Sequence, residues 1–134
     1  MKNLLTAEII YNIEQKCFTE PWSLEMVKAH LNTKHSTTLI KTANSVPVGY
    51  ATGIKLDGES ELYRIAVLPE YRKQGIAKEL LARFSEKCGG AVFLEVRSKN
   101  TAAIKLYESA GFTEIGRRSK YYGDDDAVIY KYQA

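Results

Sequence analysis

The stretch from Glu61 to Arg97 constrains the fold more than any other, because it predicts a strand, a helix and a second strand in succession. The two extended runs are Glu61 to Val67 and Ala91 to Arg97, and the helical pattern between them stops at Gly89-Gly90. Strands joined through a helix run parallel in one sheet, which predicts an α/β layered domain. The apolar positions of the expected helix are Ile76, Leu80, Leu81 and Phe84.

Two further helices are expected before this crossover. Thr6 is predicted to cap a first helix that fades before Pro21, and Ser23 is predicted to cap a second helix. Trp22 stands just ahead of that second cap, a position from which a large apolar residue packs on the helix four residues beyond the cap, here at Val27. Trp22 is therefore expected to be at least partly structural.

The remaining segments predict hairpins and one short helix. Turns at Asn44 to Pro47 and at Asp57-Gly58 separate extended runs, and Asn100 is expected to cap a helix over 101–110. We therefore expect one domain, residues 1–134, with a mixed, mostly antiparallel sheet of about six to seven strands and helices on both faces. The additional strands are expected at 37–42, 48–56, 112–122 and 127–132.

Composition and charge exclude several classes of protein. With 45% hydrophobic residues the chain can bury a core, which excludes intrinsic disorder. The 19 Lys and Arg residues exceed the 16 Asp and Glu residues by only three, too few for a nucleic-acid-binding surface. Cys17 and Cys88 lack C-x-x-C spacing and a histidine cluster, so we expect neither a disulfide framework nor a zinc site. The sequence has no apolar run of signal or membrane-spanning length, so we expect a soluble cytoplasmic protein without a membrane partner.

The loop from Arg72 to Ala77 precedes the central helix and contains the first candidate site. Gly75 and the small Ala77 stand at the helix start, with basic side chains around them. Free backbone N–H groups at such a start can bind a phosphate or pyrophosphate. The loop lacks the Gly-Lys-Ser/Thr of a P-loop and the third glycine of a dinucleotide fingerprint. A basic turn that merely starts a helix explains the local sequence equally well.

Glu95 is the only acid inside the strand 91–97 and is the candidate general base. Its neighbours in the sequence are apolar, so the carboxylate should lose hydration and its pKa should rise, as a base for near-neutral chemistry requires. Alternatively, Glu95 lies at the exposed end of the strand or pairs with Arg97 or Lys99. Tyr107 on the next helix could aim its hydroxyl at the same place, although a tyrosine among apolar residues more often belongs to the core.

Aromatic and acidic side chains elsewhere are candidates for a substrate-binding site. Tyrosines at alternate strand positions could line a groove, although they more often pack half-buried. The turn Asp124-Asp125-Asp126 is interpreted as solvated, with a lesser chance of contacting a cationic substrate. His30 and His35 have no third partner of ligand type, so no metal is expected. The candidate substrate-binding residues are Trp22, Glu61, Tyr63, Tyr121 and Tyr122.

These motifs together resemble the GNAT-superfamily N-acetyltransferases, and most closely the bacterial ribosomal-protein-alanine N-acetyltransferases. The resemblance covers nearly the whole chain. The loop motif marks the superfamily, whereas the motif around Glu95 and Tyr107 is much narrower. The segments that carry the resemblance are Pro21-Trp22-Ser23, Ile65 to Pro69, Arg72 to Ala77, Leu94 to Phe112, Arg117-Arg118 and Tyr121-Tyr122.

The resemblance implies acetyl-coenzyme A as cosubstrate and no metal. By position, backbone groups of Ile65 to Val67 would pair with the pantetheine arm, Asn100 would touch it further along, and amides across Arg72 to Lys78 would hold the pyrophosphate. Glu95 would act as general base and Tyr107 as general acid. The implied cofactor-binding residues are Ile65, Ala66, Val67, Arg72, Lys73, Gln74, Gly75, Ile76, Ala77, Lys78 and Asn100.

Two departures from the family pattern leave this expectation in place. Ala77 replaces the commoner second glycine and is an accepted variant, and the short link Cys88-Gly89-Gly90 is remote from the chemistry.

The implied activity is direct transfer of acetyl to a protein N-terminal amine, expected to be the alanine of a small-subunit ribosomal protein. A weak carboxylate base suits this acceptor, because an α-amino group titrates near about 7.7–8.0 and a lysine near about 10.4. Glu61 and the Asp124 to Asp126 turn could attract basic residues that follow the alanine. The alternatives are acetylation of lysine side chains or of a small-molecule amine on the same scaffold, and a non-catalytic acyl-coenzyme A sensor or interaction module.

Overall fold

The computed structural model describes residues 2–133, so residues 1 and 134 of the expected domain lie outside the described part. The described residues form a six-stranded sheet with the strand order β1-β2-β3-β4-β6-β5. Among the strand pairs of residues 2–133, only β3–β4 is parallel, which confirms the mixed, mostly antiparallel sheet. In chain order the elements are α1 (Lys2–Cys17), α2 (Leu24–Leu31), β1 (Ser36–Ala43), β2 (Val46–Lys55), β3 (Glu59–Val67), the 3-10 turn η1 (Pro69–Tyr71), α3 (Ile76–Cys88), β4 (Ala91–Arg97), α4 (Thr101–Ser109), β5 (Thr113–Arg118) and β6 (Ala127–Gln133).

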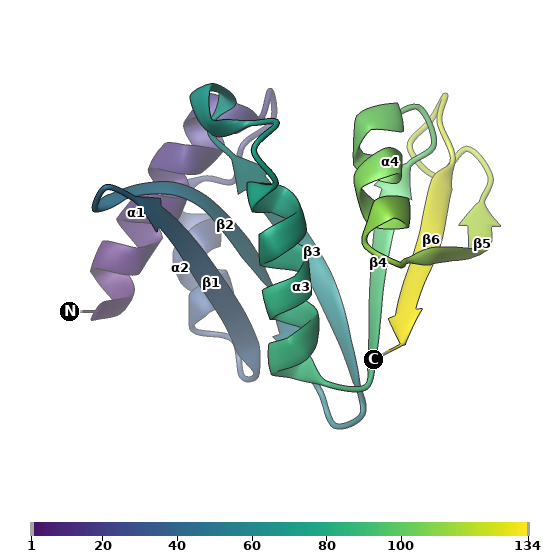
Figure 1. Cartoon of the computed structure of the whole chain (residues 1–134), viewed down its shortest axis with the longest axis horizontal. Coiled ribbons are helices and arrows are strands. Elements are labelled where there is room, and N and C mark those ends of the chain that lie inside the picture. The colour runs from purple at the N-terminus through teal and green to yellow at the C-terminus, as the bar shows by residue number, and fades with distance from the viewer. Residues whose placement is uncertain (1, 134) are drawn as a thin grey trace.

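Helices cover both faces of the sheet, as expected. α1 and α2 pack on β1 to β3 from one side, whereas α3 and α4 lie on the other (Figure 1). The core on the α3 side includes Leu80 and Phe84, and the core on the α1 side includes Ile10 and Tyr50. Full burial of each such apolar side chain contributes about 1.5–3 kcal/mol. The two cores fix the sheet between them.

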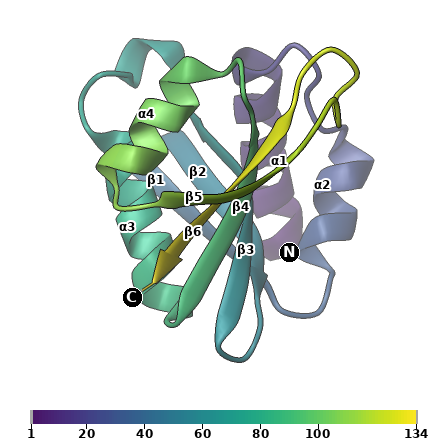
Figure 2. The same ribbon diagram turned by 90° about the vertical axis from the view of Figure 1, so that its right-hand side faces the viewer.

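The strands β3 and β4 separate along their length. They pair only through Glu59 with Ala91, Ser60 with Val92, and Glu61 with Phe93. Beyond these residues the strands diverge, so that β4 to β6 with α4 stand apart from the rest of the sheet (Figure 1) and lie in front of it in the turned view (Figure 2). We call this divergence the splay. It leaves one edge of β3 without a neighbouring strand from Leu62 onward.

Several element boundaries differ from those predicted. Thr6 does not cap α1, which begins at Lys2, because no glycine or proline interrupts the residues before Thr6. The first hairpin turn is only Asn44-Ser45, both with positive φ as a two-residue hairpin requires, so β2 begins at Val46 rather than Val48. The caps at Ser23 and Asn100 are confirmed by hydrogen bonds to the helix N–H groups.

The strand β5 is shorter than the predicted 112–122. It ends at Arg118, and Lys120 adopts a left-handed φ of 51° that cannot continue a strand. Among residues 2–133, no helix is long and apolar enough to cross a membrane.

Candidate active site

The free edge of β3 at the splay offers main-chain groups of Ile65 and Val67. The N–H of Leu68 bonds to Val48 on β2 over 2.8 Å, whereas the carbonyl of Val67 points the other way and accepts from Arg72 Nε at 2.8 Å. In an antiparallel pair the N–H and C=O of one residue face the same edge, so the N–H of Val67 also faces the splay. The same alternation turns Ile65 toward the splay and Ala66 toward β2.

The loop before α3 presents a run of unused amides. The N–H groups of residues 73 to 78 donate to no other group in the described part of the chain. Lys73 and Gly75 both have positive φ, at 63° and 83°, and the helix macrodipole adds partial positive charge here. The run of free N–H groups therefore begins at Lys73, and we call residues 73–78 the cradle. The N–H of Arg72 already bonds to Pro69 and its side chain to Val67.

Glu95 lies where the splay begins, two residues beyond the last paired residue of β4. Its side chain is 26% exposed and pairs with Arg118 at 3.2 Å, so the expected apolar enclosure is wrong. The apolar neighbours Leu94 and Val96 face the α3 core, and the alternation of a strand turns Glu95 to the opposite face. The partner is Arg118, not Arg97 or Lys99 as the alternative supposed.

Tyr107 is buried in the core on the α3 side, beside Phe112 and Tyr130. Burial raises the pKa of Tyr107 to about 12, so its phenol keeps its proton at neutral pH. The hydroxyl has no hydrogen-bond partner within residues 2–133. Asn100 caps α4 through Ala103, which confirms its structural role.

The aromatic candidates gather on the face that carries Glu95, which we call the acceptor face. The ring of His30 lies 5.5 Å from Trp22 and 5.4 Å from Tyr63. The other two tyrosines, Tyr121 and Tyr122, contact each other at 5.1 Å between ring centroids. An open groove of about 390 Å³ adjoins this face, lined by Phe18, Thr19, Glu20, Arg64 and Arg97.

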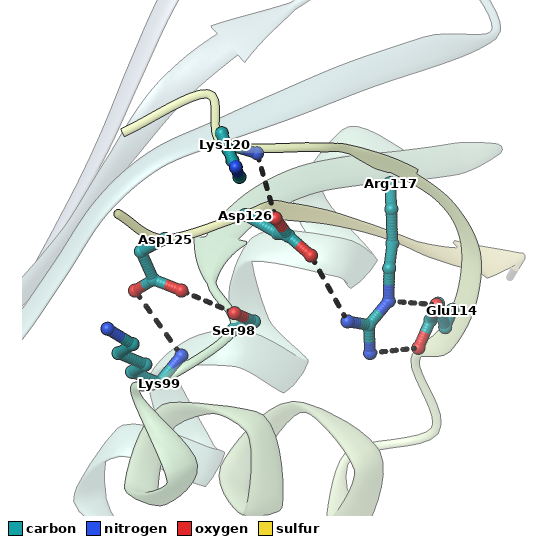
Figure 3. Close-up of polar contacts among 7 residues, drawn as sticks. All are labelled: Ser98, Lys99, Glu114, Arg117, Lys120, Asp125 and Asp126. Carbon is teal, nitrogen blue, oxygen red and sulfur yellow. Dashed lines mark hydrogen bonds and ion pairs between the residues drawn. The ribbon is translucent and has the colours of Figure 1, made fainter. Parts of the chain in front are cut away.

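The loop that carries Tyr121 and Tyr122 is fixed by its aspartates, so interpreting the whole acidic turn as solvated was wrong. Asp125 is buried, accepts from the hydroxyl of Ser98 and from the N–H of Lys99 at 3.4 Å, and its pKa is lowered by these bonds (Figure 3). Asp126 accepts from the N–H of Lys120 at 2.8 Å. Only Asp124 remains largely exposed.

The sequence analysis did not predict one buried network of hydrogen bonds, which is centred on Glu14. Glu14 of α1 is fully buried, receives two bonds from Arg64 at 2.8 and 3.2 Å, and also accepts from Trp22 N–H at 2.7 Å and from the hydroxyl of Tyr50. Burial and the adjacent carboxylate raise the pKa of Tyr50 strongly. The available signal was that Glu14 continues the apolar stripe of α1, four residues after Ile10.

The splay brings the candidates together in two sets. Its β3 side holds the main-chain groups of Ile65 and Val67 and the cradle of residues 73–78, which fit a pantetheine arm and a pyrophosphate. Its β4 side holds Glu95 on the acceptor face and, on the helix that follows, Tyr107 in the core of the opposite face. Within the described residues no three His, Cys, Asp or Glu side chains are grouped as metal ligands would be.

Comparison with known proteins agrees with this arrangement. The sequence profile described as the Acetyltransferase (GNAT) family matches residues 7–112. The [ribosomal protein bS18]-alanine N-acetyltransferase of Escherichia coli (strain K12) is 37% identical over 127 residues, which span 89% of this chain and 85% of that protein. The N-alpha-acetyltransferase RimI of Mycobacterium tuberculosis (strain ATCC 25618 / H37Rv) is 36% identical over 117 residues, 83% of this chain and 73% of that protein.

Comparison of the fold with solved structures supports the same family. The crystal structure of the ribosomal-protein-S18-alanine N-acetyltransferase from Escherichia coli superposes with a TM-score of 0.87 at 30% identity, covering 96% of this chain and 88% of that one. As its motifs predicted, the chain belongs to the acetyltransferase (GNAT) family and is an acetyl-coenzyme A-dependent N-acetyltransferase.

Proposed function

We propose that this enzyme transfers the acetyl group of acetyl-coenzyme A directly to the N-terminal α-amine of a ribosomal protein that begins with alanine. The observation that carries the proposal is the splay, which has unused main-chain N–H groups on one side and the carboxylate of Glu95 on the other. The relatives whose names include bS18-alanine support the choice of acceptor.

The β3 side of the splay would hold acetyl-coenzyme A. Amides of residues 73–78 would bind the pyrophosphate, and main-chain groups of Ile65 would pair with the pantetheine arm, since the carbonyl of Val67 is already bonded to Arg72. Asn100 would contact that arm from the start of α4. The N–H of Val67 would then donate to the thioester oxygen, where negative charge develops in the transition state.

Side chains on the β4 side of the splay would transfer the protons of the reaction. The amine nitrogen attacks the thioester carbonyl carbon, and its proton passes to Glu95, directly or through a water. When the carbon–sulfur bond breaks, the leaving thiolate takes a proton from the hydroxyl of Tyr107, which is protonated because its pKa is raised to about 12. Transfer is direct, so the enzyme forms no covalent intermediate and mainly orients the amine against an activated acyl group.

The acceptor face would bind the peptide. Trp22, Tyr63, Tyr121 and Tyr122 provide aromatic walls, and Glu61 provides a carboxylate near Glu95. An alanine side chain is small enough to leave the approach of its amine unobstructed. Because Asp125 and Asp126 are engaged within the protein, the turn offers basic residues of the peptide only Asp124.

The proposal is tested with matched peptides and a ribosomal extract. A peptide that begins with alanine should be acetylated far faster than the same peptide with a blocked terminus and one free lysine, because orientation of the reacting groups is worth several powers of ten. Mass spectrometry of N-termini after incubation of the enzyme with acetyl-coenzyme A and total ribosomal protein should identify one small-subunit protein. Equal rates on both peptides, or a preference for a small polyamine, would reject the ribosomal acceptor and leave the family assignment intact.

A further inference from the structure

The side chain of Arg118 crosses the sheet to reach Glu95. Arg118 ends β5, which β6 separates from β4, yet its Nη2 lies 3.2 Å from Oε1 of Glu95. Ala127 of β6 stands opposite both Arg118 and Arg97. Since Ala127 presents only a methyl group, a long side chain can pass over β6 at this point.

A second carboxylate lies beside this ion pair. Glu61 of β3 pairs with Phe93, so Glu61 and Glu95 lie on the same face of adjacent strands, two residues apart in register. Burial and then the charge of Glu95 raise the pKa of Glu61, whereas the charge of Arg118 lowers it. Arg118 is therefore the cation that both carboxylates share.

The position of Arg118 is itself supported. Its guanidinium lies 5.3 Å from the ring centroid of Tyr121, within cation–π range, and the Tyr121 loop is anchored through Asp125. Arg97 stacks on Tyr122 at 4.2 Å instead and forms no ion pair with Glu95 in the described part of the chain. The two arginines of this face thus have different partners.

We propose that Arg118 is a positioning residue for the reaction: its ion pair fixes the Glu95 carboxylate beside the splay, and its positive charge offsets the repulsion between Glu95 and Glu61. This inference rests on the proposed function, in which Glu95 is the general base. Without Arg118, two neighbouring carboxylates repel each other and the pair takes up a proton at a higher pH. A protonated Glu95 could not accept the proton of the amine.

Other charged or titratable groups share the acceptor face, and the test must separate them from Arg118. Arg97 and Lys131 are cations that stack on aromatic rings, and His30 is held against Thr52. The groups are Glu61 and Arg64 of β3, Arg97 of β4, Arg118 of β5, Lys131 of β6, His30 of α2, and Tyr121 and Tyr122 of the loop.

The experiment follows the side-chain carboxyl carbons of Glu61 and Glu95 by ¹³C NMR as pH is lowered. In Arg118→Gln the pH of first proton uptake by the pair should rise by roughly 0.5–1 unit, a modest shift because the site is partly open to solvent. Arg118→Lys should restore most of the difference. Adding Glu61→Gln to Arg118→Gln should abolish the rise, because one charge of the repelling pair is gone.

Arg117→Gln is the matched control. Arg117 is on the same strand, is 51% exposed against 54% for Arg118, and pairs with Glu114 and Asp126 rather than Glu95. The Arg117→Gln variant should leave the titration of Glu61 and Glu95 unchanged. In parallel, the acid limb of kcat should move upward in Arg118→Gln, while the KM for acetyl-coenzyme A stays constant.

The outcomes separate this inference from the function on which it rests. An unchanged titration in folded Arg118→Gln, or an equal shift in Arg117→Gln, would overturn the role of Arg118. Wild-type turnover in Glu95→Gln would instead overturn Glu95 as base, whatever the titration shows.

Discussion

The two parts of the sheet on either side of the splay are built differently. Strands β1 to β3 have helices on both faces, and their site contribution is main-chain N–H and C=O groups at an edge and in a loop. Strands β4 to β6 have α4 on one face, and on the other they present the side chains of Glu95, Arg97 and Arg118. The difference suggests that the first part is suited to a constant ligand and the second to a variable acceptor.

The largest effect should come from the second part. Glu95→Gln should lower kcat by roughly 10²–10⁴-fold, because the amine loses its proton acceptor, while the Kd of acetyl-coenzyme A stays constant. Steady-state kinetics and calorimetric titration measure the two quantities. A parallel loss of acetyl-coenzyme A affinity would break the separation between the two parts.

In the first part, the largest expected effect of a substitution is on the stability of the fold. Glu14→Gln removes the charge that binds Arg64 in a buried site and should lower the free energy of unfolding by about 3–5 kcal/mol. Glu79→Gln is the control, because the Lys41–Glu79 pair at 3.1 Å is partly open to solvent, with side chains 31% and 41% exposed, and such pairs contribute about 0–1 kcal/mol. Urea unfolding of both variants gives the comparison, and equal losses would contradict it.

Tyr107→Phe tests whether one residue serves both as core and as catalyst. The ring stays buried beside Phe112 and Tyr130, so the unfolding free energy should change little. Turnover should fall by roughly 10²-fold because the leaving thiolate loses its proton donor. If kcat is unaffected in the folded variant, Tyr107 is a core residue only.

Two glycines, one on each side of the splay, allow a matched test of the difference between the two parts of the molecule. Gly75 and Gly123 have φ near 80°, at 83° and 79°, and a Cβ at either would meet no protein atom. Gly75→Val strains the cradle and should raise the Kd of acetyl-coenzyme A by roughly 10-fold or more, given a strain of about 1–3 kcal/mol. Gly123→Val should leave that Kd unchanged and affect only the acceptor KM. The same Kd change in both variants would argue against a cradle at residues 73–78.

The smallest effect is expected at Asp125, which holds the loop that carries Tyr121 and Tyr122. Asp125→Asn weakens the bonds to Ser98 and Lys99 and should raise the acceptor KM by roughly 2- to 10-fold. Since those bonds lower the pKa of Asp125, they are fully formed at neutral pH and are lost as the pH falls through that lowered pKa. Wild type and variant should therefore converge in acid, and a difference that persists there would count against the anchor.

Sequence patterns predicted the features that depend on neighbouring residues in the chain. The strand Ala91–Arg97 has the predicted bounds, because glycines precede it and the Asn100 cap follows. The surroundings of Glu95 were mispredicted because neighbours in a strand face opposite sides of the sheet. Arg118 as its partner depends on β6 lying between β4 and β5, a long-range pairing that no local pattern shows.

The same limit applies to buried charge. Glu14 and Arg64 are 50 residues apart in the chain, and each alone looks like an ordinary surface residue. Asp125 lay in a run of three acids typical of a solvated turn, yet it binds Ser98 across 27 positions. The three acids, alike in sequence, differ in the structure only through their partners.

The cradle of residues 73–78 has a consequence for divergence among related chains. Every amino acid except proline donates the same main-chain N–H, so most substitutions at these positions leave the donors in place. The constraint there is on backbone conformation, and it is strongest where φ is positive, as at Lys73 and Gly75. With the role proposed for the cradle, distant relatives can keep one cosubstrate while their sequences drift, and percent identity in this loop understates how many of these N–H donors they share.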